Sequence, residues 1–575
     1  MPPTLVRTDL LEDPTLRGRS FVEAHTERVE TWLTGLFHEA GGSTPDRPVA
    51  LVALGGQGRR ELAPQSDLDL LLLHEGREDP GTLAEALWYP IWDEGLKLGH
   101  SVRTVRETLS LASSDLETAT ALLSARHICG AEELTLRLRE RARANWVKRG
   151  RRWVEELSAA VKERHGLAGD VAFALAPDLK EGRGGMRDVH ALGWAIAAGE
   201  PVEERLVAGL VEPYDELLEV RVELHRIQGQ PGDVLVLQEQ DAVAAALGLR
   251  DADVLMERVA SAGRRIAEVS DEAWYDLDTR HASQGLVLRR RDRKVADDLV
   301  SRHGRVALVD EMRPPSDPFA CLEVALVAAR EGQRISHSTL NALVGGPPPP
   351  EGVWPEVARK RFVELLLTGR AAVEVIEVLA ARGLWSRLLP EWRPAVSRPQ
   401  RNAYHRFTVD RHLLECAALA AERSDRVSRP DLLVMAALLH DIGKAYPELG
   451  DHSEHGAPIA AAICSRMGFD DGDAETVAVL VRHHLLLADV ATRRDLSDPA
   501  TAEHVARVLG TVERVELLQV LTEADSLATG PSAWSPWKSD LVQRLAWSAG
   551  EVLGAPAGTR RGAQQGSAPC TCTVR

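Results

Sequence analysis

Hydrophobic periodicity constrains the fold of this 575-residue chain more than any other feature, because the repeat changes early in the sequence. PVALVALGG at 48–56 and SDLDLLLLH at 66–74 have the short, apolar pattern of buried strands. Apolar residues recur at the 3.6-residue helical spacing from Pro80 to about Arg280, and again from Trp354 to about Leu553. The sequence therefore predicts an α+β chain that is predominantly α, with a small sheet near its N-terminus.

The chain is too long for a single hydrophobic core, since one core stops growing at roughly 250–300 residues. Short alternating runs within 285–312 are compatible with strands, and GGPPPP at 345–350 predicts a linker because it continues neither a helix nor a sheet. The polar, aperiodic end predicts a disordered tail. We expect an α/β domain at 1–150, an associated helical domain at 151–285, a connecting region at 286–350, a helical connector at 351–400, an all-α domain at 401–553 and the tail at 554–575.

Composition excludes several classes of protein. The formal net charge of −17 argues against broad nucleic-acid binding, because phosphate backbones are held mainly by an excess of lysine and arginine. No segment approaches the roughly 18 apolar residues of a membrane span, and the N-terminus lacks the pattern of a signal peptide. We therefore expect a cytoplasmic protein without membrane contact. Isolated cysteines in apolar contexts predict neither disulfides nor a zinc knuckle: Cys129, Cys321, Cys416 and Cys464.

Two carboxylates on the second predicted strand form the first candidate site. Asp67 and Asp69 are separated by one residue, so their side chains point to one face while Leu68 points to the other. Magnesium prefers hard oxygen ligands and often combines one or two carboxylates with substrate phosphates. The spacing predicts a catalytic Mg²⁺ site suited to nucleotidyl transfer, although alternating runs of this kind also occur in ordinary strands with a solvated edge.

A glycine-rich turn between the two strands carries groups suited to binding a triphosphate. Glycines let backbone N–H groups approach phosphates closely, arginines neutralise phosphate charge, and a serine hydroxyl can donate to a phosphate oxygen. The candidate nucleotide-binding residues are Gly55, Gly56, Gly58, Arg59, Arg60 and Ser66. The order of strand, glycine turn, basic pair and DxD resembles the nucleotidyltransferase superfamily.

That superfamily usually has a third carboxylate on a later strand, and the sequence leaves its position open. LGHSVRT at 98–104 has His100 and Ser101 where an acid would be expected, and Asp93 is better explained as a solvated helix residue. PDLKEGRGGMRDVH at 177–190 is either a glycine turn that closes over the nucleotide or a charged loop between helices. The residues considered in that segment are Lys180, Glu181, Arg187 and Asp188.

A histidine and an aspartate at the end of an apolar helix form the second candidate site. LLVMAALLHDIGKAY at 432–446 places His440 beside Asp441, and burial of such a pair is costly unless a metal or a partner compensates. The pattern H…HD…D resembles the ligand order of the HD phosphohydrolase superfamily. Its members in this chain are His412, His440, Asp441 and Asp525.

Further histidines follow, as in HD enzymes that hold two metals, and each is explained equally well as a surface or capping residue. They are His452, His455, His483 and His484, of which we favour His484 and His452. A site of nitrogen and oxygen ligands would hold Mn²⁺, Fe²⁺, Zn²⁺ or Mg²⁺, and such a metal lowers the pKa of bound water. With Lys444 as a catalytic group that stabilises phosphate charge, the expected reaction is hydrolysis of a phosphate ester or diester.

The two sites in this order resemble the bifunctional PII uridylyltransferase/uridylyl-removing enzymes of the GlnD family. The resemblance rests on LWYPIWDEGLKLGHSVRT, PDLKEGRGGMRDVH, YHRFTVDRHLLE and LLHDIGKAYPELGDHSEHGA, and it extends to about residue 550. It implies a nucleotidyltransferase domain that transfers UMP from UTP to a tyrosine of the signalling protein PII, and an all-α HD domain that hydrolyses the bond. In some relatives the donor is ATP and the transferred group is AMP.

The sequence departs from that family at two places. Gln57 stands where the family has an aromatic or small residue, which leaves the choice between UTP and ATP open. The family continues into two glutamine-binding ACT domains, whereas this sequence ends in APCTCTVR, so we expect activity without glutamine control. Two alternatives are an HD-domain metal phosphohydrolase with a non-catalytic, nucleotide-sensing N-terminal domain, and a non-catalytic scaffold that binds PII.

Overall fold

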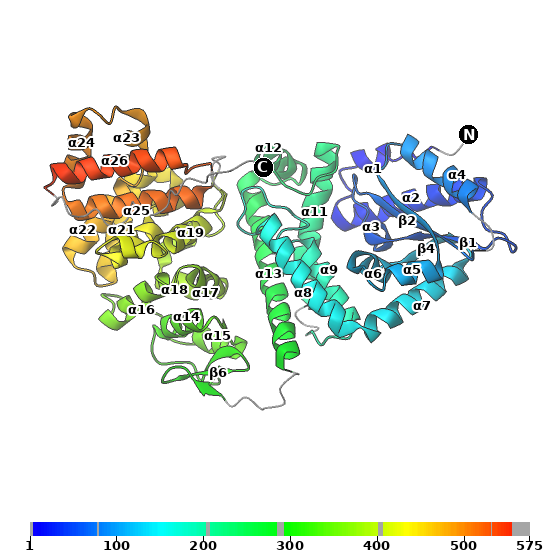
Figure 1. The fold of residues 1–575 in the computed structure, drawn as a ribbon, viewed down its shortest axis with the longest axis horizontal. Helices are drawn as coiled ribbons and strands as arrows, with labels where there is room; N and C mark the ends of the chain where they lie inside the picture. The colour runs from blue at the N-terminus through cyan, green and yellow to red at the C-terminus, as the bar shows by residue number, and fades with distance from the viewer. Residues whose placement is uncertain are drawn as a thin grey trace, which may run out of the picture. The chain divides into compact units, whose positions relative to one another are not determined.

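A computed structural model describes residues 4–76, 80–202, 207–283, 292–400, 406–530 and 532–554. The chain divides into two compact units, Met1–Leu288 and Arg289–Arg575. Figure 1 shows the elements of each unit. The finer domain boundaries inferred from the sequence stay predictions, and the predicted tail lies, after Gly554, outside the described residues.

A four-stranded sheet with the strand order β3-β2-β1-β4 lies in the N-terminal part of the first unit. Its strands are β1 (Val49–Ala53), β2 (Leu68–His74), β3 (Leu98–Thr104) and β4 (Arg126–Gly130). β1 pairs antiparallel with β2 and β4, whereas β2 and β3 run parallel, with Asp69 opposite Gly99. The first three strands lie where the sequence predicts strands.

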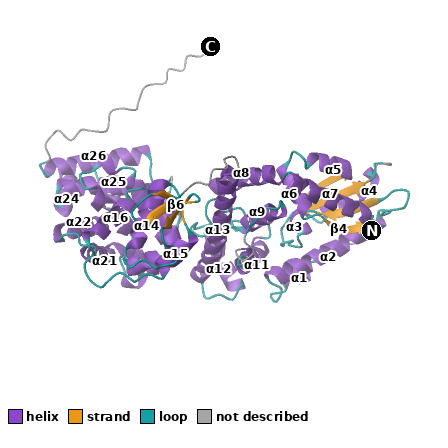
Figure 2. Ribbon diagram, turned by 90° about the horizontal axis from the view of Figure 1, so that it is seen from below, coloured by secondary structure: helices purple, strands orange, loops and turns teal. Residues whose placement is uncertain are grey.

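Helices cover both faces of this sheet. Alternate side chains of β2 point to opposite faces, and the leucines on each face pack against helices. Leu68, Leu70 and Leu72 pack with α2 and α4, whereas Leu71 and Leu73 pack with α6 and α7. Figure 2 shows the strands between α7 and α2. The helices of this part are α1 (Thr8–Glu12), α2 (Gly18–Glu39), α3 (Gly55–Gly58), α4 (Gly81–Asp93), α5 (Val105–Leu111), α6 (Leu116–Leu123) and α7 (Glu132–Lys148).

Strand β4 is not predicted by the helical periodicity of this region. The strand has five residues, and the stronger periods of α6 and α7 flank it on both sides. Long-range contacts hold it in the sheet. Arg126 donates to the carbonyl oxygens of Gln57 at 2.8 Å and Gly58 at 3.2 Å, and it forms an ion pair with Glu30.

The remaining helices of the first unit pack around a core that includes Trp146, Trp153, Leu217 and Ile266. The long helix α13 contacts α8, α9 and α11, as Figure 1 shows. These helices confirm the helical region predicted after the sheet. Their bounds are α8 (Gly150–Ala168), α9 (Met186–Ala197), α11 (Val211–Gln228), α12 (Leu237–Ala246) and α13 (Ala252–Ser283).

The second unit begins with a small sheet in the order β5-β6-β7-β8, with β5 (Arg293–Lys294), β6 (Leu299–Arg302), β7 (Arg305–Leu308) and β8 (Arg334–Ile335). The first three strands lie within the alternating segment of the sequence, of which 285–291 is outside the described residues. Buried residues from Leu299 to Ala549 belong to one core cluster, so this sheet packs with the helices that follow it.

The helices of the second unit confirm the helical periodicity of its sequence. The early ones are α14 (Ala320–Glu331), α15 (His337–Val344), α16 (Glu356–Leu366), α17 (Arg370–Ala381), α18 (Leu384–Leu388) and the 3₁₀ helix η1 (Pro390–Ala395). The later ones are α19 (Val409–Ala421), η2 (Ser424–Arg426), α20 (Pro430–Leu439), η3 (Ile442–Ala445), η4 (Pro447–Leu449), α21 (His452–Arg466), α22 (Asp471–Arg482), α23 (Leu486–Arg493), α24 (Pro499–Leu509), α25 (Val512–Thr529) and α26 (Pro536–Val552).

No helix in the described part of the chain is long and apolar enough to cross a bilayer. Cys129, Cys321, Cys416 and Cys464 are buried free thiols. Burial raises the pKa of Cys129, Cys321 and Cys464 to about 12, so these thiols stay protonated at neutral pH.

Candidate active sites

Two glycines leave space for the carboxylate of Asp69 beside strand β2. A Cβ atom at Gly99 would lie 2.6 Å from Oδ1 of Asp69, and one at Gly55 would lie 2.3 Å from Oδ2. Gly55 also has a φ of 53°, in the region that favours glycine. Any side chain at either position would therefore displace the carboxylate.

The surroundings of Asp69 oppose its negative charge. Burial, and after it the charge of Asp67, raise the pKa of Asp69 to about 6, whereas Lys180 and Arg59 act in the opposite direction. Asp69 is half-buried, and the exposed Asp67 directly precedes β2. A divalent cation shared by the two carboxylates would relieve their repulsion, so these residues fit a metal.

The glycine turn folds as the single helical turn α3. Gly55 and Gly56 begin this turn, so their N–H groups have no partner within the helix. A Cβ atom at Gly58 would lie 2.3 Å from the carbonyl oxygen of Ser124, next to β4. Gly58 therefore allows α3 to pack closely against the backbone at Ser124, whereas Gly55 makes room for the carboxylate of Asp69.

The two arginines of the turn have different environments. Nε of Arg59 lies 2.9 Å from Oε2 of Glu61, which fixes the guanidinium within electrostatic reach of Asp69. Arg60 is exposed and has a φ of 62°, a strained conformation for a residue other than glycine. Ser66 is half-buried directly ahead of Asp67. Of the two arginines, Arg59 is therefore the one whose charge acts on Asp69.

The third carboxylate does not appear as a close ligand in the described part of the chain. No further histidine, cysteine, aspartate or glutamate there completes a group with Asp67 and Asp69 whose ligand atoms lie within 4.8 Å of one another. Asp93 is exposed at the end of α4. The charge of Glu117, in the first turn of α6, does act on Asp69. Its sequence context did not single it out, because acidic residues are common at helix starts.

His100 packs away from the carboxylates. Its ring centroid lies 5.4 Å from that of Trp88 and 5.5 Å from that of Trp92, both on α4. The residue of β3 that lies opposite Asp69 is Gly99. A glycine inside a strand is a sequence signal for close approach, and it could have indicated this contact.

Gln57 is a buried member of α3, and neither polar atom of its side-chain amide has a hydrogen-bond partner among the described residues. We expect Gln57→Met to stabilise the fold by about 1 kcal/mol, because an unsatisfied buried amide costs about 1–3 kcal/mol and methionine has a similar volume. The measurement is the midpoint of thermal unfolding. The control is Gln238→Met on the exposed side of α12, which should leave the midpoint unchanged. A midpoint that does not rise for Gln57→Met would show that water or another group satisfies the amide.

The second candidate site is built around α20, whose residues from Leu432 to Leu439 are all fully buried. This apolar helix ends directly before the HD pair and places it at the centre of the helical unit. The ligand-type side chains that meet there come from α19 (His412), the residues after α20 (His440 and Asp441), the start of α21 (His452), the chain after α22 (His484) and α25 (Asp525).

His412, His440 and Asp525 form the first group of ligand atoms. The two Nε2 atoms lie 3.1 Å apart. Oδ1 of Asp525 lies 3.1 Å from Nε2 of His412 and 3.3 Å from Nε2 of His440. These atoms converge closely enough to share one cation.

Asp441, His452 and His484 form the second group. Oδ1 of Asp441 lies 3.4 Å from Nε2 of His452 and 3.5 Å from Nε2 of His484. Its other oxygen, Oδ2, lies 3.4 Å from Nε2 of His440 and 3.5 Å from Nε2 of His412. Asp441 therefore presents one oxygen to each group.

Hydrogen bonds orient the histidine rings toward the other ligands. Nδ1 of His440 lies 2.9 Å from the carbonyl oxygen of Ala437, and Nδ1 of His484 lies 2.7 Å from that of Val481. Because a carbonyl only accepts, Nδ1 of each ring carries a proton and donates it, so Nε2 is the atom that can present a lone pair to a bound cation. Converging lone pairs and carboxylates fit a cation.

The electrostatics of the second site support the same conclusion. Burial lowers the pKa of His484 to about 4, so this ring is neutral at physiological pH, as a metal ligand must be. Burial raises the pKa of Asp525, but His440 and His412 outweigh burial and hold it well below its usual value. Oδ1 of Asp441 is buried and has no hydrogen-bond partner among the described residues. A metal would satisfy that oxygen.

Lys444 lies on η3 beside these ligands. Its Nζ is 2.6 Å from Oδ2 of Asp441 and donates to Oε1 of Gln400 at 2.8 Å. Its role toward a phosphate stays a prediction. No local pattern marks Gln400, which only the fold brings to this lysine. Of the four further histidines, the half-buried His455 and His483 lie outside both groups.

Comparison with known families gives two matches. The family described as GlnD PII-uridylyltransferase matches residues 152–274, and the HD domain family matches residues 409–530, which contain all the ligands of the second site. The first match begins in α8, after the sheet that carries Asp69 and the helix α7, and it includes the glycine turn at 177–190.

Curated relatives carry the name bifunctional uridylyltransferase/uridylyl-removing enzyme. The protein of Streptomyces coelicolor is 44% identical over 571 residues, which cover 95% of this chain and 67% of the relative. That of Mycobacterium tuberculosis is 41% identical over 93% of this chain and 67% of its own, and that of Corynebacterium glutamicum is 35% identical over 84% and 69%. The chain belongs to the family of bifunctional uridylyltransferase/uridylyl-removing enzymes.

Proposed function

We propose that the first unit transfers UMP from UTP to a tyrosine of the signalling protein PII and that the second unit hydrolyses the resulting bond. The observation that supports this most strongly is the presence of two separate sets of potential metal ligands, one in each unit. A nucleotidyl transfer and a hydrolysis could each use one of these sites. The family membership supplies the expected nucleotide and protein substrates.

At the transferase site, the chain would bind and orient the triphosphate. Asp67 and Asp69 would hold Mg²⁺, which neutralises phosphate charge and favours attack at phosphorus. Arg59, fixed by Glu61, supplies a second positive charge next to Asp69. The tyrosine hydroxyl oxygen of PII would attack the α-phosphorus of UTP and lose its proton, while the bond to the bridging oxygen breaks and pyrophosphate leaves.

At the HD site, the ligands would hold Mn²⁺, Fe²⁺, Zn²⁺ or Mg²⁺, and the two oxygens of Asp441 favour a pair of ions. Bound cations would make a water nucleophilic at neutral pH and polarise a phosphoryl oxygen. Hydrolysis releases UMP and restores the tyrosine hydroxyl. Lys444, beside Asp441, is placed to stabilise negative charge on the phosphate.

The test uses the full chain, purified PII and UTP or ATP labelled at the α-phosphorus, with Mg²⁺ or Mn²⁺. We expect label on PII from UTP, and release of labelled UMP when modified PII is incubated with the chain without UTP. If only ATP labels PII, the donor is ATP and the transferred group is AMP. No label from either nucleotide would contradict the transferase assignment.

A second candidate function is a hydrolase whose N-terminal unit senses a nucleotide without catalysis. The observation that favours it is the lack of a close third carboxylate at Asp67 and Asp69 within the described residues. This function predicts UTP binding by the chain and UMP release from modified PII, with no label transferred to PII. The same assay therefore separates the two functions.

A further inference from the structure

The glycine turn between α8 and α9 carries a lysine for which the proposed reactions have no role so far. Oδ1 of Asp178 accepts the backbone N–H groups of Lys180 at 3.0 Å and Glu181 at 2.8 Å. A Cβ atom at Gly184 would lie 2.2 Å from the carbonyl oxygen of Gly263, so the turn packs tightly on α13. The backbone at Lys180 is therefore held in place.

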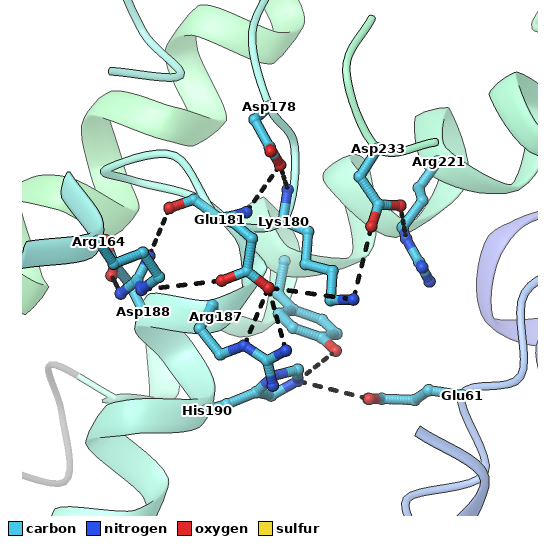
Figure 3. Close-up of polar contacts among 11 residues, drawn as sticks. Glu61, Arg164, Asp178, Lys180, Glu181, Arg187, Asp188, His190, Arg221 and Asp233 are labelled. Carbon is cyan, nitrogen blue, oxygen red and sulfur yellow. Dashed lines mark hydrogen bonds and ion pairs between the residues drawn. The ribbon is translucent and has the colours of Figure 1, made fainter. Parts of the chain in front are cut away.

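Charged side chains position the ammonium group of Lys180, as Figure 3 shows. Its Nζ lies 3.5 Å from Oδ2 of Asp233 and 3.9 Å from Oε1 of Glu181. Both carboxylates also pair with an arginine: Asp233 with Arg221 at 2.6 Å, and Glu181 with Arg187 at 3.0 Å. The carboxylates thus share their charge with other cations, and the side chain of Lys180 is 32% exposed. Its charge is available to a further anion.

Hydrogen bonds connect this cluster to the chain that carries the transferase carboxylates. Nε2 of His225 lies 3.0 Å from Oδ1 of Asp233. Its Nδ1 accepts the backbone N–H of Gln65 at 3.2 Å, two residues ahead of Asp67. Through Asp233 and His225, the contacts of Lys180 therefore reach the segment that leads into β2.

A second connection reaches Arg59. Nε2 of His190, on α9, lies 2.9 Å from the hydroxyl oxygen of Tyr214 and 3.5 Å from Oε2 of Glu61, which holds Arg59. Figure 3 shows His190 pointing toward Glu61. Burial lowers the pKa of His190 to about 4, so its ring is neutral at physiological pH. This neutral ring links α9 to Glu61, just after α3. The turn at 177–190 and α3 therefore form one polar assembly.

We propose that Lys180 binds the triphosphate of the nucleotide at the transferase site, as a second cationic group beside Arg59. The inference rests on the proposed function and adds a phosphate-binding residue to it. The charges of Lys180 and Arg59 both act on Asp69, although Lys180 lies in the turn before α9 and Arg59 directly follows α3. Asp233 and Glu181 are positioning residues that aim the ammonium.

The first test replaces the side chain. We expect Lys180→Met to weaken binding of UTP and of pyrophosphate about 10- to 100-fold, measured by calorimetry with Mg²⁺, because a hydrogen bond to a charged group is lost. Binding of uridine should be unchanged, and Lys180→Arg should retain most of the phosphate affinity. The matched control is Lys162→Met, an exposed lysine on α8.

The second test needs no variant. Acetylation of the wild-type chain with an amine reagent, followed by mass spectrometry, should show that UTP and pyrophosphate protect Lys180 but not Lys162. Absence of protection, or a folded Lys180→Met that binds UTP as tightly as the wild type, would overturn the inference. A wild-type chain that binds UTP and shows this protection but never labels PII would instead contradict the proposed transferase function.

Discussion

Asp69→Asn is expected to lower the rate of UMP transfer to PII at least about 1,000-fold, since metal-assisted charge stabilisation supplies several kcal/mol of the catalysis. Asparagine keeps the shape of the side chain, so it fits the space between Gly55 and Gly99, but it loses the charge that would hold the cation. Hydrolysis of previously modified PII should continue, because its ligands lie in the other unit. The measurement is label transferred to PII from UTP under single-turnover conditions.

The matched control is Asp93→Asn, which removes an exposed carboxylate at the end of α4. It should transfer UMP at the wild-type rate. If Asp69→Asn also transfers at that rate, the metal of the transferase site is held elsewhere and the assignment of Asp67 and Asp69 is wrong.

Asp441→Ala is expected to slow removal of UMP from PII at least about 1,000-fold, because it takes away a ligand oxygen from each of the two groups. Transfer should continue, so modified PII should accumulate in a reaction that contains UTP. The metal bound by the purified chain, measured by elemental analysis, should fall as well. The two activities would then separate between the two units.

Two comparisons distinguish the loss of a ligand from the loss of folding. Asp471→Ala, at an exposed position in the first turn of α22, should leave removal and metal content unchanged. Continued transfer by Asp441→Ala would show that the first unit is intact, and the unfolding midpoint would report on the second. Full removal activity with unchanged metal content would place the hydrolytic site away from Asp441.

The transferase half shows how far local sequence patterns reach. The short apolar run around Asp69 is a property of neighbouring residues, and it correctly predicts a buried strand. The same local rules failed at β4, because a five-residue strand between two helices is specified by its pairing with β1 and by contacts of Arg126, not by its own period. They also missed Gly99, whose importance depends on the parallel pairing with β2.

The sequence by itself determined the fold class, the two sites and their order along the chain, because strand alternation, helical spacing and the HD pair are local patterns. Only the tertiary structure decided which residues act together. It separated His452 and His484 from His455 and His483, because ring orientation depends on how α21 and α22 pack against α20. It also brought Lys180 within electrostatic reach of Asp69. Such encounters between distant segments follow from packing and shared hydrogen bonds, which no local pattern encodes.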